Sequence, residues 1–383
     1  MRRKVVFLAA SVLLLFSLLA DNSYAMKAGS FEISPFIAVT VRYSDNVFLT
    51  RDDTKSDFST VISPGIQLVY PRAKTRHQLS LRYNADIEIF NRYSSENAVS
   101  HTAEGRFGMI FPMGLELSVG DVFRRSHDAR GINFGPELDF FWNNSFYVSA
   151  GYSFTDRWRV QLDYTNTIFR YDAERNNFRN YTAHTFAGYL YYRFRPKASA
   201  FVEYEYSIVN FDESDELNGS GQHIFAGITW DVTDKTKGTV KAGFGIRDFD
   251  NSSISGYGGL ILEATIDHRF NSKHSISLRA LRATSETNLI GSDFIVSTAL
   301  SAAYMYRITG KLTGKASIEY NRESYKGRVR KLDNTWRAGI GLAYQFKRWL
   351  LTEVGYLYTI RDSSVDDYDY RNNMYFLRVV GTL

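Results

Sequence analysis

The sequence has no cysteine, only 6 prolines among 383 residues, and no long apolar segment beyond its first 25 residues. Without thiols the chain cannot form disulfides, a cysteine-ligated zinc or iron–sulfur site, a cysteine nucleophile or a lipid anchor on an N-terminal cysteine. A mean hydropathy of -0.28 argues against a bundle of membrane helices, which would be strongly apolar. Small disulfide scaffolds, thiol enzymes and helical membrane proteins are thereby excluded.

The chain also lacks a strong excess of either charge. It has 46 lysines and arginines against 41 aspartates and glutamates, which gives a net charge of +5. Three of the basic residues precede an apolar run at the N-terminus, so the rest of the chain is close to neutral. The composition therefore gives no reason to expect a nucleic-acid partner.

The N-terminus has the pattern of a secretory signal peptide. Basic residues at positions 2–4 precede an apolar run over residues 5–20, and Ala25 ends a small-x-small cleavage site. A membrane anchor is the alternative, but this run of 16 residues is shorter than the about 20 residues that a helix needs to cross a bilayer. We therefore expect residues 1–25 to be removed on export, and residues 26–383 to form one domain.

The rest of the chain alternates between apolar and polar residues over segments of about 10 to 14 residues. In one such segment, Leu81, Tyr83 and Ile87 alternate with Arg82 and Asp86. A period of two predicts strands with one apolar and one polar face. There are 18 such segments. Because the alternation weakens in two of them, we expect 16 to 18 strands.

The connections between these segments alternate in length, with tight turns following longer polar loops. A propeller would place four short strands in the about 40 residues that here hold two long ones. A sandwich would have to bury every apolar face in one core. A closed barrel in a membrane exposes its apolar face to lipid and leaves no backbone donor unpaired. The sequence therefore predicts an all-β fold, a transmembrane antiparallel up-and-down β-barrel of about 18 strands.

Aromatic residues make up 15% of the sequence and gather near the predicted strand ends. Rings at these positions typically form girdles in the headgroup layers of the membrane. The alternative is that they are only strand-favouring residues of an all-β protein. The predicted girdle at the tight turns contains Tyr70, Phe111, Phe154, Trp158, Phe194, Trp230, Phe270, Phe346 and Trp349. The predicted girdle at the longer loops contains Tyr43, Phe90, Tyr171, Phe211 and Tyr325.

The first predicted hairpin carries a motif. The segment from Tyr43 to Thr50 reads Tyr-Ser-Asp-Asn-Val-Phe-Leu-Thr, and it is followed by Ser-Asp-Phe at 56–58 and Ile-Ser-Pro-Gly at 62–65. This combination resembles the N-terminal signature of the putative β-barrel porin 2 family of Gram-negative bacteria. The resemblance implies an outer-membrane barrel without catalytic residues and, for some members, an association with extracellular polysaccharide production.

No combination of residues predicts an active site. The seven histidines do not fall at metal-ligand spacing, and HExxH, GxSxG and Walker-type loops do not occur in the sequence. We therefore expect no enzyme, cofactor or metal, although a barrel hydrolase with groups on separate strands would leave no linear pattern. The acidic connections at 212–216 and 362–369 are candidates for divalent cations, but they lack the spacing of a calcium loop.

The polar face of the predicted strands lines the lumen of such a barrel. It carries both signs of charge, so we expect a hydrated wall whose charges pair across neighbouring strands and select weakly between cations and anions. Inward Tyr147, Tyr189 and Tyr191 either stack on sugar rings or fill space. The charged candidates for the pore lining are Arg42, Arg82, Asp86, Glu88, Arg106, Arg159, Asp163, Glu203, Glu205, Glu263, Asp267, Lys315, Glu319, Arg337 and Glu353.

The sequence thus predicts a passive, water-filled channel in the Gram-negative outer membrane that exports exopolysaccharide. The expected partners are outer-membrane lipid, lipopolysaccharide, the polysaccharide, and periplasmic or inner-membrane export components that supply the motive force. The alternatives are a general diffusion porin for small hydrophilic solutes and a surface adhesion barrel with a closed lumen. The longest predicted connection, 44–57, is the candidate constriction of the pore.

Overall fold

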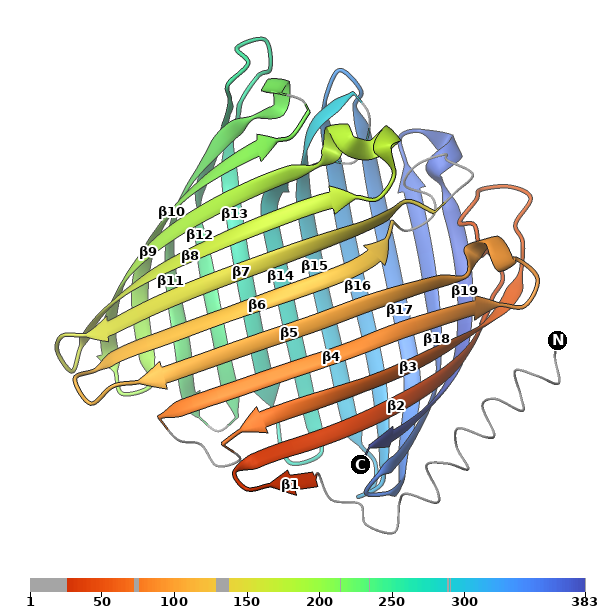
Figure 1. Ribbon diagram of the computed structural model, residues 1–383, viewed down its shortest axis with the longest axis horizontal. Helices are drawn as coiled ribbons and strands as arrows, with labels where there is room; N and C mark the ends of the chain where they lie inside the picture. Colours follow the sequence, from red (N-terminus) through yellow and green to blue (C-terminus); the bar gives the residue numbers. More distant parts are fainter. Residues whose placement is uncertain are drawn as a thin grey trace.

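One antiparallel β-sheet closes on itself in the structure of this chain (Figure 1). The structure is a computed structural model that describes residues 26–71, 76–128, 138–213, 215–233, 235–287, 289 and 291–382. The predicted signal peptide and the tip of the connection at 129–137 lie outside these residues. Within them, eighteen long strands form the barrel, in agreement with the alternation of the sequence.

Each strand pairs with its neighbours in the chain. The strands are β1 (Met26–Ala28), β2 (Phe31–Ser44), β3 (Asp57–Tyr70), β4 (His77–Phe90), β5 (Ala98–Ile110), β6 (Leu115–His127), β7 (Phe140–Ser153), β8 (Trp158–Tyr171), β9 (Tyr181–Arg195), β10 (Ala198–Phe211), β11 (Gly219–Thr233), β12 (Thr236–Phe249), β13 (Tyr257–Arg269), β14 (His274–Ser285), β15 (Ser292–Arg307), β16 (Leu312–Gly327), β17 (Lys331–Lys347), β18 (Leu350–Ser363) and β19 (Tyr370–Thr382).

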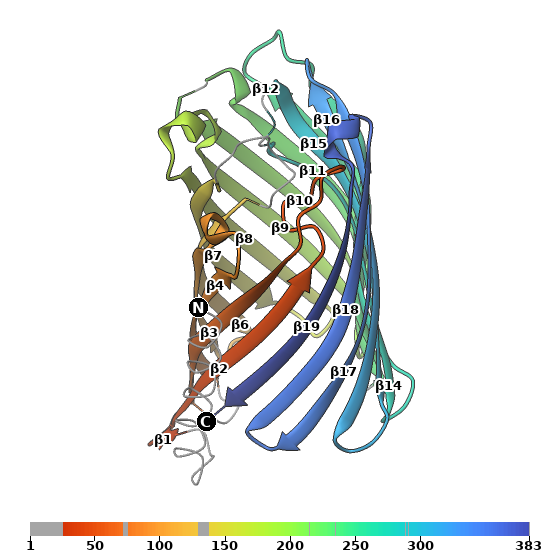
Figure 2. The ribbon, with the colours of Figure 1, turned by 90° about the vertical axis from the view of Figure 1, so that its right-hand side faces the viewer.

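The barrel closes where the last strand, β19, pairs with β2 (Figure 2). This pairing extends from Met374 opposite Ser44 to Thr382 opposite Phe36. β2 begins five residues before Phe36, and there the short strand β1 pairs with it instead. The alternation did not predict β1, because three residues are too few to show a period. β1 continues the pairing of β2 beyond the end of β19.

The two ends of the barrel differ, as the connection lengths predict. One end has tight turns such as 111–114 and 308–311, which we call the turn end. The other, the loop end, has longer connections such as 45–56 and 172–180. In the described part of these connections lie four short 3-10 helices: η2 (Ser94–Glu96), η3 (Glu174–Arg179), η4 (Asp215–Leu217) and η5 (Asp366–Tyr368). Among the described residues, no helix is long and apolar enough to cross a membrane.

The outer face of the barrel is apolar. Leu162, Leu260 and Ile340 have 67%, 73% and 65% of their surface exposed, and many exposed apolar side chains on one face are typical of a barrel that spans a membrane. Some outward polar groups interrupt this face. On β6, Asp121 accepts hydrogen bonds from Nδ2 of Asn144 at 2.9 and 3.0 Å. This is one of the segments in which the sequence loses its alternation.

A set of outward tyrosines marks the loop-end border of the apolar face. In each case the phenol oxygen lies 2.6–3.2 Å from a polar side chain on the next strand, within hydrogen-bond distance. That side chain is not directly opposite the tyrosine. It lies two residues further toward the loop end. Such rings suit the interface between lipid and water. The pairs are Tyr83 with His101, Tyr164 with His184, Tyr204 with Gln222, Tyr320 with Asn334, and Tyr356 with Asn373.

The predicted loop-end girdle is wrong for four of its five members: Phe90 has the same inward phase in β4 as Glu88, and three others are buried. Tyr171, Phe211 and Tyr325 are only 7%, 5% and 4% exposed, and they face the lumen. Tyr171 and Tyr325 line a cavity inside the barrel, and Phe211 packs 5.5 Å from the inward ring of Tyr181. The prediction relied on their position at strand ends, whereas their phase in the alternation already assigned them to the inward face.

Residues of the sequence motif at the end of β2 form hydrogen bonds with the last strand, β19. The Asp45 carboxylate accepts hydrogen bonds from the backbone N and Nδ2 of Asn373 at 2.7 and 2.6 Å. Nδ2 of Asn46, a residue only 1% exposed, donates to the carbonyl oxygens of Arg371 at 2.9 Å and Thr50 at 2.7 Å. The loop after β2 is therefore fixed to the last strand.

The same loop reaches into the lumen. Asn46 Oδ1 accepts a hydrogen bond from the backbone N of Thr50 at 3.1 Å, and Arg51 bonds Asp366 of η5 at 2.9 Å. The hydrogen bond to Asp366 raises the pKa of Arg51. Between these two attachments, Leu49 has a positive φ of 53° and lines the cavity inside the barrel. Leu49 is thus the residue through which the predicted constriction loop contacts the lumen.

Candidate functional site: the lumen

All fifteen charged residues predicted to line the pore lie on the face opposite the exposed apolar side chains. Each contacts a further inward side chain. The contacts are Arg42 with Glu88, Arg82 with the ring of Phe36, Asp86 with Ser63, Arg106 with Glu104, Arg159 with Glu116, Asp163 with Gln161, Glu203 and Glu263 with Lys241, Glu205 with His223, Asp267 with Arg279, Lys315 with Glu353, and Glu319 with Arg337.

Several of these ion pairs skip a strand, which differs from the predicted pairing of direct neighbours. Glu116 on β6 meets Arg159 on β8 at 2.9 Å, across Gly151 of β7. A Cβ atom on Gly151 would collide with the guanidinium group. The inward glycine thus leaves the space through which two long side chains meet over the intervening strand. The other pairs of this kind are Arg42 with Glu88, Glu203 with Lys241, and Lys315 with Glu353.

The most buried of these pairs lies on β10 to β13. The side chain of Glu203 is 1% exposed and bonds Nζ of Lys241 at 2.9 Å, and the same Nζ lies 3.1 Å from Glu263. The ammonium group also lies 4.2 Å from the ring centroid of Phe225. A charge this far from water is tolerated only with such partners. Lys241 therefore links carboxylates of two other strands, β10 and β13, within the wall.

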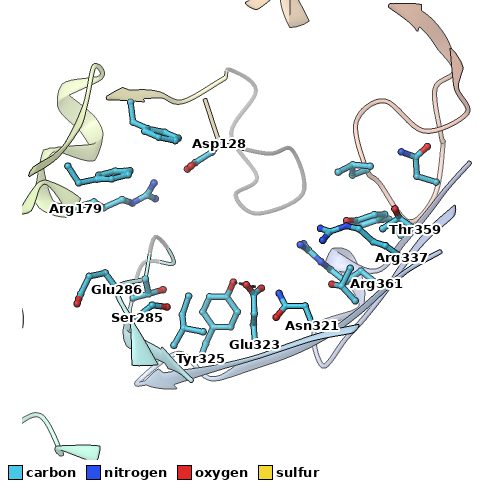
Figure 3. A pocket seen from close by; sticks show the side chains of 18 of the residues that line it. Asp128, Arg179, Ser285, Glu286, Asn321, Glu323, Tyr325, Arg337, Thr359 and Arg361 are labelled. Atoms are coloured by element: carbon cyan, nitrogen blue, oxygen red, sulfur yellow. Dashed lines mark hydrogen bonds between the residues drawn. The ribbon is translucent and has the colours of Figure 1, made fainter. Parts of the chain in front are cut away.

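At the loop end, the lumen contains a cavity of about 580 Å³. Figure 3 shows Asp128 and Arg179 on one side of it, with Arg337, Thr359 and Arg361 across from them. Of the fifteen predicted residues, only Arg337 lines this cavity. The lining residues that the sequence analysis missed include Asp128, Arg179, Glu286, Asn321, Glu323, Thr359 and Arg361.

The missed residues fall into two groups. Glu323 and Arg361 have the same phase in their strands as inward Glu319 and Glu353, so the alternation contained a signal for them. Arg179 ends helix η3 and has no such signal, because the period of two stops at the end of a strand. Only a three-dimensional structure places such loop residues in the lumen.

Cations in this region lie over aromatic rings. The guanidinium of Arg179 lies 5.3 Å from the ring centroid of Tyr171, and that of Arg361 lies 5.0 Å from the ring centroid of Tyr370. Lys331 Nζ bonds Asp333 at 2.9 Å and lies over Tyr368. These contacts stabilise positive charges away from bulk water.

The two acidic connections are engaged in protein contacts. Asp212 bonds Arg170 at 2.9 Å, and Glu213 accepts a hydrogen bond from Asn177 at 3.0 Å. In the second connection Asp366 bonds Arg51, as described above. In the described part of the chain, no group of three or more His, Asp or Glu side chains is placed to hold a metal ion.

The lumen therefore has a wall of paired charges on rigid strands, with aromatic rings concentrated on β7 to β11. Pairs of opposite sign give no strong field in either direction, and hydroxyl, amide and carboxylate groups keep the wall hydrated. Such a wall suits hydrophilic solutes of low charge better than a strongly charged ion.

Comparison with known proteins agrees with this geometry. A family described as "Putative beta-barrel porin 2" matches residues 23–382, which is nearly the whole chain. No curated protein matches the sequence.

Several solved structures are similar to the chain in fold. The outer membrane protein OpdK from Pseudomonas aeruginosa has a TM-score of 0.47 and 10% identity, with 92% of this chain and 99% of that chain covered. OccAB3 from Acinetobacter baumannii has a TM-score of 0.46 and 11% identity, with coverages of 92% and 99%. The FrpB iron transporter from Neisseria meningitidis has a TM-score of 0.44 and 8% identity, with coverages of 86% and 62%.

Proposed function

Since this chain belongs to the putative beta-barrel porin 2 family and forms a porin-like barrel of the outer membrane, we propose that it is a passive, water-filled channel for exopolysaccharide leaving the cell. The family and fold are those of channels, and we propose no enzymatic activity. The first long strand, β2, begins at the turn end of the barrel, and the last strand, β19, finishes there. We assign the turn end to the periplasm.

The observation that carries the proposal is the pairing of charges along the inward wall. Arg337 with Glu319 at 2.6 Å and Lys315 with Glu353 at 2.8 Å leave little net charge on their strands. A wall with little net charge presents no electrostatic barrier to a neutral polymer chain or to the water that hydrates it. Neutral or weakly charged sugar polymers therefore fit this lumen better than small ions of one sign.

The channel supplies a path and no energy. The sequence contains no Walker-type loop for nucleotide binding. The motive force for a polymer would come from its synthesis or from periplasmic and inner-membrane export components. On the outer face, the exposed apolar side chains contact outer-membrane lipid and lipopolysaccharide.

Planar-bilayer recording of the purified barrel tests the channel itself. We expect stepwise conductance of porin magnitude with weak preference between potassium and chloride. A correctly folded barrel that never conducts would contradict a channel and favour a surface barrel with a closed lumen.

A deletion strain tests the cargo. We expect loss of the barrel to trap polysaccharide in the periplasm while its synthesis continues. If export is normal in the deletion strain but uptake of small sugars into liposomes requires the barrel, the protein is a general diffusion porin.

A further inference from the structure

Six half-buried aromatic rings face the lumen from three adjacent strands, and we call them the aromatic wall. We propose that the aromatic wall is a binding track for a carbohydrate chain, an inference that rests on the channel function proposed above. The rings are Phe141 and Tyr147 on β7, Phe169 on β8, and Tyr181, Tyr189 and Tyr191 on β9.

The three rings nearest the loop end form one surface. The ring of Phe169 lies 4.8 Å from that of Phe141 at an interplanar angle of 25°, and 5.6 Å from that of Tyr181 at 2°. Buried Tyr171 and Phe211, which also face the lumen, pack beside this surface at 6.1 Å from Phe141 and 5.5 Å from Tyr181. The packing needed to hold the rings is thus supplied by residues other than the exposed ones.

The deeper rings repeat this arrangement. Tyr189 and Tyr191 lie 5.8 Å apart at an angle of 14°, and the buried ring of Phe201 supports them at 6.4 and 5.2 Å. Tyr147 lies over Gly120 of β6, where a Cβ atom would collide with the ring. Its ring therefore rests against the wall instead of projecting across the lumen.

The rings extend over a distance that only an extended ligand spans, with Tyr147 level with Thr185, midway between Tyr181 and Tyr189. Eight residues separate Tyr181 from Tyr189, which is about 26 Å along the strand. Some of the inward residues among the rings carry hydroxyl groups, and Ser145 and Thr167 lie within hydrogen-bond distance of each other at 3.3 Å. They are Ser145, Thr165, Thr167 and Thr185.

A sugar chain matches this sequence of surfaces. A pyranose ring has an apolar face of C–H groups, which pack on the negative face of an aromatic ring, and an edge of hydroxyls that need hydrogen-bond partners. Tyr189 is paired in the sheet with Gln161, and Tyr191 with Arg159, so polar groups flank the deeper rings. Several weak sites in series hold a polymer without trapping it.

Several rings elsewhere in the lumen differ from the aromatic wall, because a cation lies over each of them. Arg82 lies over Phe36, Lys331 over Tyr325, and Arg361 over Tyr370. Among the described residues, Tyr191 is the one ring of the aromatic wall with such a cover, which Arg159 provides at 5.6 Å. The other rings of the wall are partly exposed in the lumen.

The test is block of ion current by oligosaccharides in planar bilayers, with cellohexaose and maltohexaose as probes. We expect reversible block of the wild-type channel and a threefold to tenfold weaker block in Phe169→Leu and Tyr189→Leu, the change expected for losing one aromatic contact of about 1 kcal/mol. Phe169→Tyr and Tyr189→Phe should keep the block. The matched control is Phe376→Leu, an inward ring that lies over Gly355 on the opposite wall.

The outcomes separate the binding track from the channel. Conducting wild-type channels that neither sugar blocks would overturn the track and leave the channel intact, and so would equal block in the leucine variants and the wild type. Block by benzoate but by neither sugar would mean that the wall binds aromatic acids instead. If the folded barrel does not conduct, the proposed function fails, and calorimetric titration of the detergent-solubilised barrel with cellohexaose still decides the track.

Discussion

The ring of Tyr147 lies directly over the Cα atom of Gly120, its partner in the register of β6 and β7. A glycine in a strand interior normally weakens the strand, because it packs nothing and is flexible in the unfolded chain. Here the neighbouring ring covers the glycine backbone, an arrangement that restores packing at the position. The lumen uses the same device for Phe201 over Gly227 and for Phe376 over Gly355.

Substitution Gly120→Val should displace the Tyr147 ring. A branched side chain at this position overlaps the ring, so we expect a loss of about 1–3 kcal/mol in the free energy of unfolding, as for overpacking of a core. Urea titration of the folded barrel, followed by the shift in gel mobility on heating, measures it. Gly108→Val is the matched control, because a Cβ atom there meets nothing within 4 Å. Equal losses in both variants would contradict the packing role of the glycine.

Reversal of Arg159 should change ion selectivity. In Arg159→Glu the carboxylate of Glu116 loses its partner at 2.9 Å and a second negative charge appears beside it. We expect the zero-current potential in a potassium chloride gradient to shift toward cation selectivity. The double variant E116R/R159E restores the pair and should return the potential to the wild-type value. An unchanged potential in the single variant would show that this pair does not line the conducting path.

Removal of the ammonium group from the buried cluster should be costly. Lys241→Met leaves Glu203 with an uncompensated charge away from water, for which about 3–5 kcal/mol of destabilisation is expected. The variant E203Q/K241M should recover most of this loss. Lys315→Met serves as the comparison, because its side chain is 41% exposed and such pairs contribute about 0–1 kcal/mol. Urea unfolding of the variants measures the difference.

Substitution Asn46→Ala should release the constriction loop. Four hydrogen bonds are lost: two that Asn46 donates, to the carbonyl oxygens of Arg371 and Thr50, and two that it accepts, from the backbone N and the hydroxyl of Thr50. We expect Leu49 to leave the cavity, which would raise the conductance and make the loop sensitive to protease. In the control Arg51→Gln, only an exposed ion pair with Asp366 is weakened, and we expect a smaller effect. Unchanged conductance in Asn46→Ala would show that Leu49 does not narrow the path.

The architecture was predictable because lipid and water impose opposite chemistry on the two faces of every strand. Leu81 and Tyr83 point outward and Arg82 inward, as their order in the sequence predicts. The pattern weakens where that contrast fails, at outward Asp121, and the girdle prediction failed where position was used without phase, at Tyr171 and Tyr325. In both tyrosines the phase of the alternation was the better guide.

The arrangement of the lumen was less predictable. Which charges pair depends on the register between strands, and the sequence does not contain that register. Glu116 and Arg159 are separated by a whole strand, and their contact depends on a glycine at the right level of β7. Arg179 reaches the cavity from a 3-10 helix, where no periodic pattern identifies it.

The bonds from Asp45 and Asn46 to β19 have a consequence for assembly. Their partners lie more than 300 residues later in the chain, so the first loop cannot take up this conformation until the last strand has arrived. The conformation of the first loop therefore depends on a complete chain. A barrel that lacks its last strand lacks the groups that hold Leu49 in the lumen. The segment that resembles the family signature is thus the one whose hydrogen bonds to β19 form only when the barrel has closed.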